Sequence, residues 1–276
     1  MPNVNINEKR GYEASVPVEK IWSKFQDSNI VSNLCIPLGE NEKKADVCTD
    51  LISAHHILAA GVALSGFGMF RRVALATLLK FNKPEDLKFI LIDPLEISFF
   101  DFRNIDKHLV FPIITGNKKA IEALEWANQE MKRRYDVLAE NRTHYLKDYN
   151  ENNPDKKIPV LVIMLTELGE LLDYDKEAEK LILRLVMRSK CVGIHLIITT
   201  QRPTKDVITG LLKANIPTKI AFQTNDKEES LVIIDKVGAE ELLGQGDMLV
   251  DSYLQSKPQR LQGYYLPEDN IRELVF

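Results

Sequence analysis

Short continuous runs of apolar residues, rich in isoleucine and valine, recur along this chain. Runs of this kind are typical of strands that are covered on both faces, as in parallel sheets. The pattern predicts buried strands at residues 56–60, 89–92, 160–165, 195–199 and 219–222. His195 interrupts one of these runs, and in that setting we expect a hydrogen-bonded core residue and not a ligand.

Between these runs, apolar residues return at helical spacing. Ile121, Leu124 and Met131 mark a helix over residues 118–140, and a second helix is predicted from about 176 to 190. Strands that alternate with helices form right-handed crossover units and a parallel sheet. The predicted fold class is therefore α/β, with a mostly parallel sheet and helices on both faces. Residues 149–157 are polar and contain asparagine and proline, which predicts a surface loop.

The composition fits a folded protein of one large or two small domains, because the 276 residues are 45% hydrophobic. Residues 1–35 are predicted to be an irregular lead-in with one amphipathic stretch at 18–25, and residues 36–276 to be the folded domain. The net charge of −4 gives no basic footprint for nucleic acid. Any DNA contact is thus expected to be local, for example through loops that face a pore.

Targeting and redox signals are absent from the sequence. The first residues lack the apolar centre of a signal peptide, and no stretch reaches the roughly 18 apolar residues of a membrane span. Cys35, Cys48 and Cys191 are odd in number and lack the spacing of a metal site. We therefore expect a cytoplasmic chain with free thiols, no metal site and no membrane insertion of its own.

A glycine-rich stretch, Gly-Val-Ala-Leu-Ser-Gly-Phe-Gly, follows the first predicted strand at residues 61–68. It keeps Gly61 and Gly66 of the pattern G-x-x-x-x-G-K-[ST], in which backbone N–H groups and a helix N-terminus hold phosphates. In that pattern a lysine contacts the β and γ phosphates and a hydroxyl binds magnesium. Phe67 stands at the lysine position and Gly68 at the hydroxyl position. Ser65 completes the candidate loop, although two glycines at this spacing carry little weight alone.

Two other predicted strands end in polar residues. Thr166 and Glu167 follow the strand at 160–165, where an aspartate for magnesium and a catalytic glutamate are found in such sites. Thr200 and Gln201 follow the strand at 195–199, and ligands of open α/β sheets lie beyond such ends. The alternatives are a solvent-facing glutamate at 167 and a turn in which Pro203 simply stops the strand. The basic runs at 71–72 and 132–134 are expected to be solvated helix faces.

Several stretches are similar to the motor domain of FtsK/SpoIIIE-type DNA translocases, in the HerA-FtsK group. The resemblance extends over residues 36–265 and is closest at 206–217 (DVITGLLKANIP) and 238–249 (GAEELLGQGDML). Shorter matches lie at residues 36–39, 89–94, 131–135, 148–151 and 193–203. The resemblance implies a RecA-like P-loop NTPase core, a hexameric ring around double-stranded DNA, and ATP with magnesium hydrolysed between subunits. It also implies a role in chromosome partition and cell division. The membrane-spanning region that tethers family members and their winged-helix module have no counterpart in this sequence.

The departures from the family share a direction, because charged or magnesium-binding groups have become apolar or neutral. Phe67, Gly68 and Thr166 replace the lysine, the hydroxyl residue and the aspartate, while Glu167 keeps the glutamate. Leu95 and Leu231 stand where the family carries a lysine and an arginine. Loss of one charge-stabilising group in phosphoryl transfer costs about 10³–10⁵ in rate. The leading hypothesis is a pseudo-ATPase with an idle Glu167, kept as a scaffold, ring partner or regulator.

Two alternatives remain open at this point. One is an active translocase with a rewired site, in which Arg71 or Arg72 replaces the missing lysine. The other is a protein-docking module, as degenerate domains serve in related secretion ATPases. In the leading hypothesis the Phe67 ring is expected to plug the nucleotide pocket, and the departures argue against use of ATP and magnesium.

Overall fold

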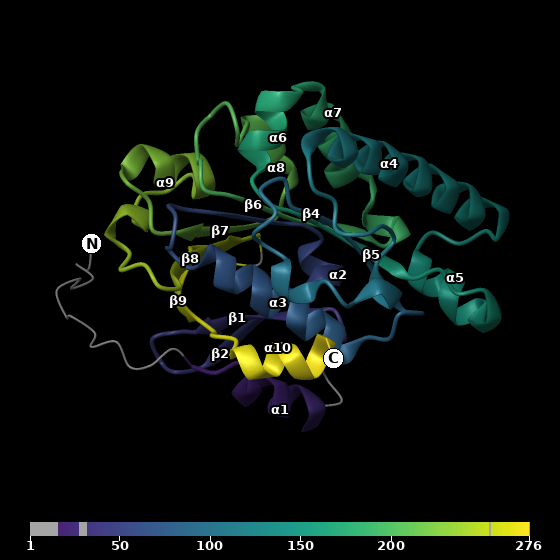
Figure 1. Cartoon of the computed structure of the whole chain (residues 1–276), viewed down its shortest axis with the longest axis horizontal. Coiled ribbons are helices and arrows are strands. Elements are labelled where there is room, and N and C mark those ends of the chain that lie inside the picture. Colours follow the sequence, from purple (N-terminus) through teal and green to yellow (C-terminus); the bar gives the residue numbers. More distant parts are fainter. Residues whose placement is uncertain (1–15, 28–31, 254, 276) are drawn as a thin grey trace.

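A mixed sheet of nine strands runs through the molecule in the order β2-β1-β9-β8-β7-β3-β6-β5-β4 (Figure 1). The structure is a computed structural model that describes residues 16–27, 32–253 and 255–275. The strands are β1 (Cys35–Glu40), β2 (Asp46–Asp50), β3 (Ile57–Ala60), β4 (Leu87–Ile92), β5 (Val160–Leu165), β6 (Ile194–Thr200), β7 (Thr218–Phe222), β8 (Asp247–Ser252) and β9 (Gln259–Gly263).

The parallel part of the sheet consists of β7, β3, β6, β5 and β4, which are the five strands that the apolar runs predict. Strand β3 is central, since Ile57 pairs with Ile197 of β6 on one side and with Thr218 of β7 on the other. The prediction of an α/β fold is confirmed, with strand ends shifted by at most two residues.

The antiparallel part of the sheet was not predicted. Strands β8, β9, β1 and β2 continue the sheet beyond β7 in antiparallel pairs. Their sequences, such as CIPLGE in β1 and QRLQG in β9, contain proline, glycine and charged residues and lack a continuous apolar run. A strand of this composition is stabilised by its neighbours in the sheet and leaves little local signal.

Helices cover both faces of the sheet, as predicted (Figure 1). Side chains alternate along each strand, so that Leu58 and Ala60 face one core while Ile57 and Ala59 face the other. The helices are α1 (Glu19–Asp27), α2 (Leu51–Ala54), α3 (Phe67–Phe81), α4 (Asn117–Glu140), α5 (Leu146–Asn152), α6 (Leu168–Tyr174), α7 (Glu177–Arg188), α8 (Gly210–Asn215), α9 (Lys227–Ile234) and α10 (Glu268–Val275). Helices α4, α6, α7, α8 and α9 pack on the first core, and α1, α3 and α10 on the second.

The amphipathic stretch at 18–25 forms the greater part of α1. Its apolar face is buried, with Val18, Ile21 and Trp22 in the second core. The Trp22 indole Nε1–H also donates to Thr77 Oγ1 of α3 at 2.8 Å. Residues 1–15 and 28–31 of the predicted lead-in lie outside the described residues, and the boundary at residue 35 stays a prediction.

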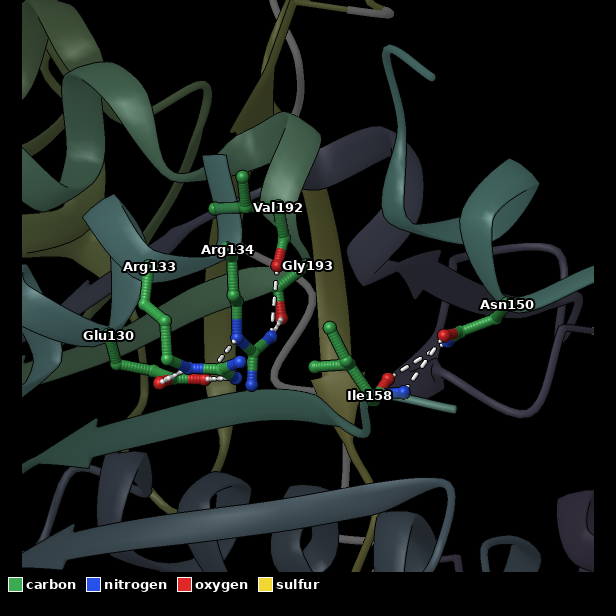
Figure 2. Close-up of polar contacts among 7 residues, drawn as sticks. All are labelled: Glu130, Arg133, Arg134, Asn150, Ile158, Val192 and Gly193. Carbon is green, nitrogen blue, oxygen red and sulfur yellow. Dashed lines mark hydrogen bonds and ion pairs between the residues drawn. The ribbon is translucent and has the colours of Figure 1, made fainter. Parts of the chain in front are cut away.

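The segment predicted as a loop at 149–157 is partly helical, which corrects that prediction. Its first residues belong to α5, and residues 154–156 form a short 3₁₀ turn. Leu146 and Tyr149 are buried three positions apart, and this pair gives the short helix an apolar face. The Asn150 side chain donates to the Ile158 carbonyl at 2.8 Å and accepts from the Ile158 N–H at 2.9 Å (Figure 2).

The basic run at 132–134 is not a wholly solvated helix face, because Arg134 points into the protein. Arg134 is 3% exposed, and its Nη1 donates to the carbonyl oxygens of Val192 at 2.9 Å and Gly193 at 3.3 Å. Figure 2 shows both Arg133 and Arg134 reaching Glu130, which binds Arg134 Nε at 2.8 Å. Arg134 therefore connects the C-terminal half of α4 to the turn that precedes β6 through hydrogen bonds.

His195 is a hydrogen-bonded core residue, as predicted. Its ring is buried, and Nδ1 lies 2.8 Å from the carbonyl oxygen of His55. Neighbouring His56 is also buried and accepts from the Leu196 N–H through Nδ1 at 3.1 Å. Burial lowers the pKa of His195 to about 4 and holds the pKa of His56 well below its usual range.

These histidines predict acid sensitivity of the fold. Both rings stay neutral in the folded chain, whereas the unfolded chain takes up protons near pH 6.5. Their contribution to stability is complete above about pH 6.5 and is lost as the pH falls toward 4, by about 1.4 kcal/mol per pH unit and histidine. Urea unfolding at about pH 7 and about pH 5 measures this loss. His195→Gln is expected to flatten the pH dependence.

The remaining expectations concern thiols and membranes. Cys35, Cys48 and Cys191 are free thiols. Among the residues that the structure describes, no helix has the length and apolar character to cross a membrane.

Candidate functional site

The glycine-rich stretch lies between the end of β3 and the start of α3, in the middle of the sheet. Two backbone hydrogen bonds fix it to the neighbouring chain: the Val62 N–H donates to the Gln223 carbonyl and the Gly246 N–H to the Ser65 carbonyl, both at 2.8 Å. Gly66 adopts a φ of +125°, and a Cβ there would lie 2.3 Å from the Gly246 nitrogen. Only glycine fits this position, because both its conformation and its close approach exclude a side chain.

Helix α3 begins at Phe67, directly after this loop, and Gly66 gives it no side-chain cap. The first N–H groups of a helix have no partner within it, and the helix dipole adds positive potential there. Ser65 is 1% exposed, and its hydroxyl has no hydrogen-bond partner. A Cβ on Gly61 would come within 3.0 Å of that hydroxyl, so the chain folds tightly across the loop. The backbone of this stretch is thus arranged like the backbone half of a phosphate-binding loop.

A cavity of about 510 Å³ opens over the loop and the first turns of α3. Most of its wall is apolar or aromatic, and its charged groups are Arg71 and Glu167. Its lining includes Gly66, Phe67, Gly68, Arg71, Leu95, Glu167, Gln201, Phe222, Tyr264 and Tyr265.

Phe67 does not close this cavity, which corrects the expectation that its ring plugs the pocket. The side chain is buried and packs edge-on against Phe222, with 6.4 Å between ring centroids. Phe70 approaches the same ring at 6.3 Å. The Phe67 ring, at the lysine position, therefore packs in the second hydrophobic core with Phe222. The cavity next to the loop stays open.

Two acidic groups lie at the ends of adjacent strands, β4 and β5. Asp93 is buried, and its Oδ2 accepts from the N–H groups of Ser98 at 2.7 Å and Phe99 at 3.2 Å. The Thr166 hydroxyl donates to Asp93 Oδ1 at 3.2 Å. Thr166 thus acts as a neutral donor to Asp93 at the position where the sequence comparison expects a second carboxylate.

Glu167 is not a solvent-facing residue, so that alternative is wrong. It is 8% exposed and precedes α6 as its N-cap residue, with a left-handed φ of +51°. Its Oε2 accepts from the Gln201 N–H at 3.2 Å. Burial raises the pKa of Glu167, while that hydrogen bond and the charge of Arg71 act in the opposite direction.

Arg71 is buried within this group, which corrects the prediction that both basic residues of α3 are solvated. It is 8% exposed, its Nη1 donates to Thr199 Oγ1 at 3.4 Å, and its guanidinium lies 5.5 Å from the centre of the Phe99 ring. Burial lowers its pKa to about 10, and the carboxylates of Asp93 and Glu167 oppose that change. The group therefore carries its positive charge at neutral pH. Arg72 differs, since it pairs with Asp101 at 2.8 Å near the surface.

Of the two polar residues at the end of β6, Gln201 lines the cavity and Thr200 does not. Gln201 is exposed and lines the cavity. Thr200 is buried, and its hydroxyl accepts from the Arg202 N–H at 3.1 Å, so it stabilises the turn before Pro203. The structure thus brings Gly66, Phe67, Gly68, Glu167 and Gln201 together at the cavity, while Gly61, Ser65, Thr166 and Thr200 do not line it.

The residues around this cavity do not fit a magnesium ion. Magnesium requires oxygen ligands in near-octahedral geometry, commonly one or two carboxylates and a hydroxyl beside the phosphates. Gly68 supplies no hydroxyl, Thr166 supplies no charge, and Arg71 Nη2 lies 3.9 Å from the place that a Cβ on Gly68 would take. Within residues 16–27, 32–253 and 255–275, no three histidine, cysteine or acidic side chains gather as a metal cluster.

Two residues of this site carry no local sequence signal of their roles. Asp93 lies within a family-like stretch, and the sequence indicates Arg71 only as a substitute for the lysine. Both lie far along the chain from their partners Thr166 and Thr199. Phe222, which supports Phe67, ends a predicted strand and carries no local signal of this role.

A glycine loop between the central strand of a parallel core and the following helix is the arrangement found in P-loop NTPases. The chain belongs to the FtsK/SpoIIIE family, whose sequence model matches residues 19–205. The DNA translocase FtsK of Clostridium acetobutylicum is 39% identical over 253 residues, which are 90% of this chain and 33% of that protein. The DNA translocase FtsK of Haemophilus influenzae is 36% identical over 299 residues, covering 98% of this chain and 56% of that protein. The chain therefore spans about a third to about half of these relatives.

Solved structures support the same fold. The conjugation coupling protein TcpA of pCW3, a monomer form with ATPγS, superposes with a TM-score of 0.75 at 23% identity. That match covers 88% of this chain and 70% of TcpA. The cytoplasmic domain of the type VII secretion ATPase EccC of Thermomonospora curvata gives a TM-score of 0.79 at 20% identity, over 95% of this chain and 34% of EccC.

Proposed function

We propose that this chain is an FtsK-type motor-domain homologue that has lost ATP hydrolysis and acts as a scaffold, ring partner or regulator. One observation carries the proposal. The glycine loop and the strand ends of the site are present, but Phe67, Gly68 and Thr166 occupy the positions of the lysine, the hydroxyl residue and the aspartate. Glu167 is the retained glutamate and lines the cavity. Without a metal-bound phosphate, a water oriented by Glu167 has no activated group to attack.

The contacts of the substituted residues support the proposal, because they are compatible with a stable fold. Phe67 packs on Phe222, and Thr166 donates to Asp93, so neither substitution leaves a buried charge unpaired. The charge of the Arg71 guanidinium acts electrostatically on the Asp93 and Glu167 carboxylates, as a metal ion would otherwise do. Burial of a carboxylate without a partner is costly, and Arg71 offsets this cost.

Steady-state phosphate release by the purified chain, with ATP, magnesium and double-stranded DNA, tests the proposal. Turnover is expected to be at least about 10³-fold below that of a family translocase motor domain assayed alongside. A Glu167→Gln variant is the matched control, because loss of an idle glutamate should leave the background rate unchanged. Ordinary turnover that depends on Glu167 would refute the proposal.

A second candidate function is an active double-stranded DNA translocase with a rewired nucleotide site. The observation that favours it is Arg71, the single lysine or arginine among the described residues that line the cavity. In this case DNA would stimulate ATP turnover, and Arg71→Ala would abolish that stimulation while Arg72→Ala would not.

We propose that this chain assembles in the way that its resemblance to the family implies. We infer a ring-shaped homo-oligomer, a hexamer by resemblance, that surrounds double-stranded DNA in the cytoplasm. The relatives named above are DNA translocases by description. Light scattering of the chain with and without a DNA duplex tests this part, and a monomer under both conditions would argue against it.

A further inference from the structure

The positively charged group at this cavity is a side chain of the protein, that of Arg71. Arg71 emerges from the second turn of α3, lines the cavity and has a buried Nε without a hydrogen-bond partner. Its Nη2 lies 3.9 Å from the place of a Cβ on Gly68, the residue that replaces the magnesium-binding hydroxyl. Its Nη1 contacts Thr199 at the end of β6. The guanidinium thus lies between the start of α3 and the strand ends.

We propose that the Arg71 guanidinium takes the place of magnesium, so that the cavity binds nucleoside phosphates without a divalent cation and prefers a diphosphate to a triphosphate. The inference rests on the proposed loss of hydrolysis, since that function removes the need for a metal ion at the phosphates. Beyond that function, the inference specifies the class of ligand that binds, the charge of that ligand and the residue that binds it.

The anion-binding groups in this arrangement come from two sources. The uncapped start of α3 presents N–H groups that lack partners within the helix. Arg71 adds a charged, planar donor that binds phosphate oxygens in a fork geometry. The apolar wall, with the half-exposed ring of Tyr265, offers a surface on which a nucleobase stacks.

The same geometry excludes a magnesium ion and limits the charge of the ligand. A divalent cation beside Gly68 would meet the Arg71 guanidinium without enough oxygen ligands to offset the repulsion. Asp93 and Glu167 already interact with Arg71 from the strand ends. Arg71 carries a single positive charge and already interacts with both carboxylates, so the less charged diphosphate is favoured over the triphosphate.

Calorimetric titration of the full chain with ADP and with ATP, each in EDTA and in excess magnesium, tests this inference. The Kd for ADP is expected to change by less than about twofold between the two conditions, and ADP is expected to bind more tightly than ATP in EDTA. Arg71→Ala should weaken ADP binding by about tenfold or more, because a charged hydrogen bond to the phosphate is lost. Arg71→Lys should fall between the two, and Arg72→Ala should bind as the parent does.

Three results would overturn the inference: magnesium tightening ADP binding tenfold or more, Arg71→Ala binding ADP as tightly as the parent, or no binding of either nucleotide. The magnesium comparison uses the unaltered chain, so it holds even if a variant fails to fold, which thermal melts would reveal. ADP carries no γ-phosphate to hydrolyse, so this result is separate from the turnover assay. ATP turnover with magnesium-independent ADP binding would contradict the proposed function alone.

Discussion

Introducing the lysine, hydroxyl and aspartate of the P-loop pattern, with Phe67→Lys, Gly68→Ser and Thr166→Asp together, is expected to leave ATP turnover at background until Arg71 is replaced as well. The triple variant has the lysine, the hydroxyl and the aspartate. It still carries a buried guanidinium, whose Nη2 lies 3.9 Å from the Cβ position at residue 68. Adding Arg71→Met, which keeps a long side chain without the charge, frees that position. Turnover of the quadruple variant should then exceed that of the triple variant by about 10³-fold or more.

Phosphate release with saturating ATP, magnesium and duplex DNA measures this difference. Arg72→Met in the triple background is the control, since Arg72 pairs with Asp101 away from the cavity. That change should not raise the rate. A triple variant that already turns over as fast as the quadruple one would show that Arg71 does not compete with the metal.

Arg134→Ala is the substitution for which we expect the largest loss of stability, about 3–5 kcal/mol. The guanidinium is buried and donates to Glu130 and to the carbonyl oxygens of Val192 and Gly193. Its removal leaves the Val192 carbonyl without this donor, the Gly193 carbonyl with the Leu161 N–H alone, and Glu130 with one partner in place of two (Figure 2). Urea unfolding followed by circular dichroism measures the change in the free energy of unfolding.

Arg133→Ala is the matched control for this prediction. Arg133 lies on the same helix and binds the same glutamate at 2.6 Å, but its side chain is 54% exposed. An exposed ion pair contributes about 1 kcal/mol or less. Equal losses for the two variants would mean that the carbonyl contacts of Arg134 contribute little.

The sequence predicted the parallel core well because its strands are buried on both faces. Strands 160–165 and 195–199 carry apolar residues at nearly every position, and this run is visible without any neighbour. Strands β1 and β9 contain glycine and charged residues and exist as strands because β8 and β2 flank them. The pairing of β1 and β9 with these strands depends on contacts between residues far apart in the sequence. For this reason no local sequence pattern predicted it.

The arginines show where prediction from pattern fails at the site. Long basic side chains on helices are mostly solvated, and both basic runs were predicted accordingly. Arg71 and Arg134 are buried because distant elements supply their partners: Thr199 from β6, and the turn at Val192 and Gly193. Gly66 and Thr166 could be located because each follows a recognisable strand. The contact of Thr166 with Asp93 depends on the adjacency of β4 and β5 in the sheet.

Single-turnover hydrolysis is the most direct measurement of the central claim that this motor fold no longer hydrolyses ATP. The chain is held in excess over radiolabelled ATP, with magnesium and duplex DNA, so that product release cannot limit the observed rate. We predict conversion at the rate of a protein-free control. Phosphate formation at about one per second or faster, the ordinary range for enzymes, and dependent on Glu167, would contradict the claim.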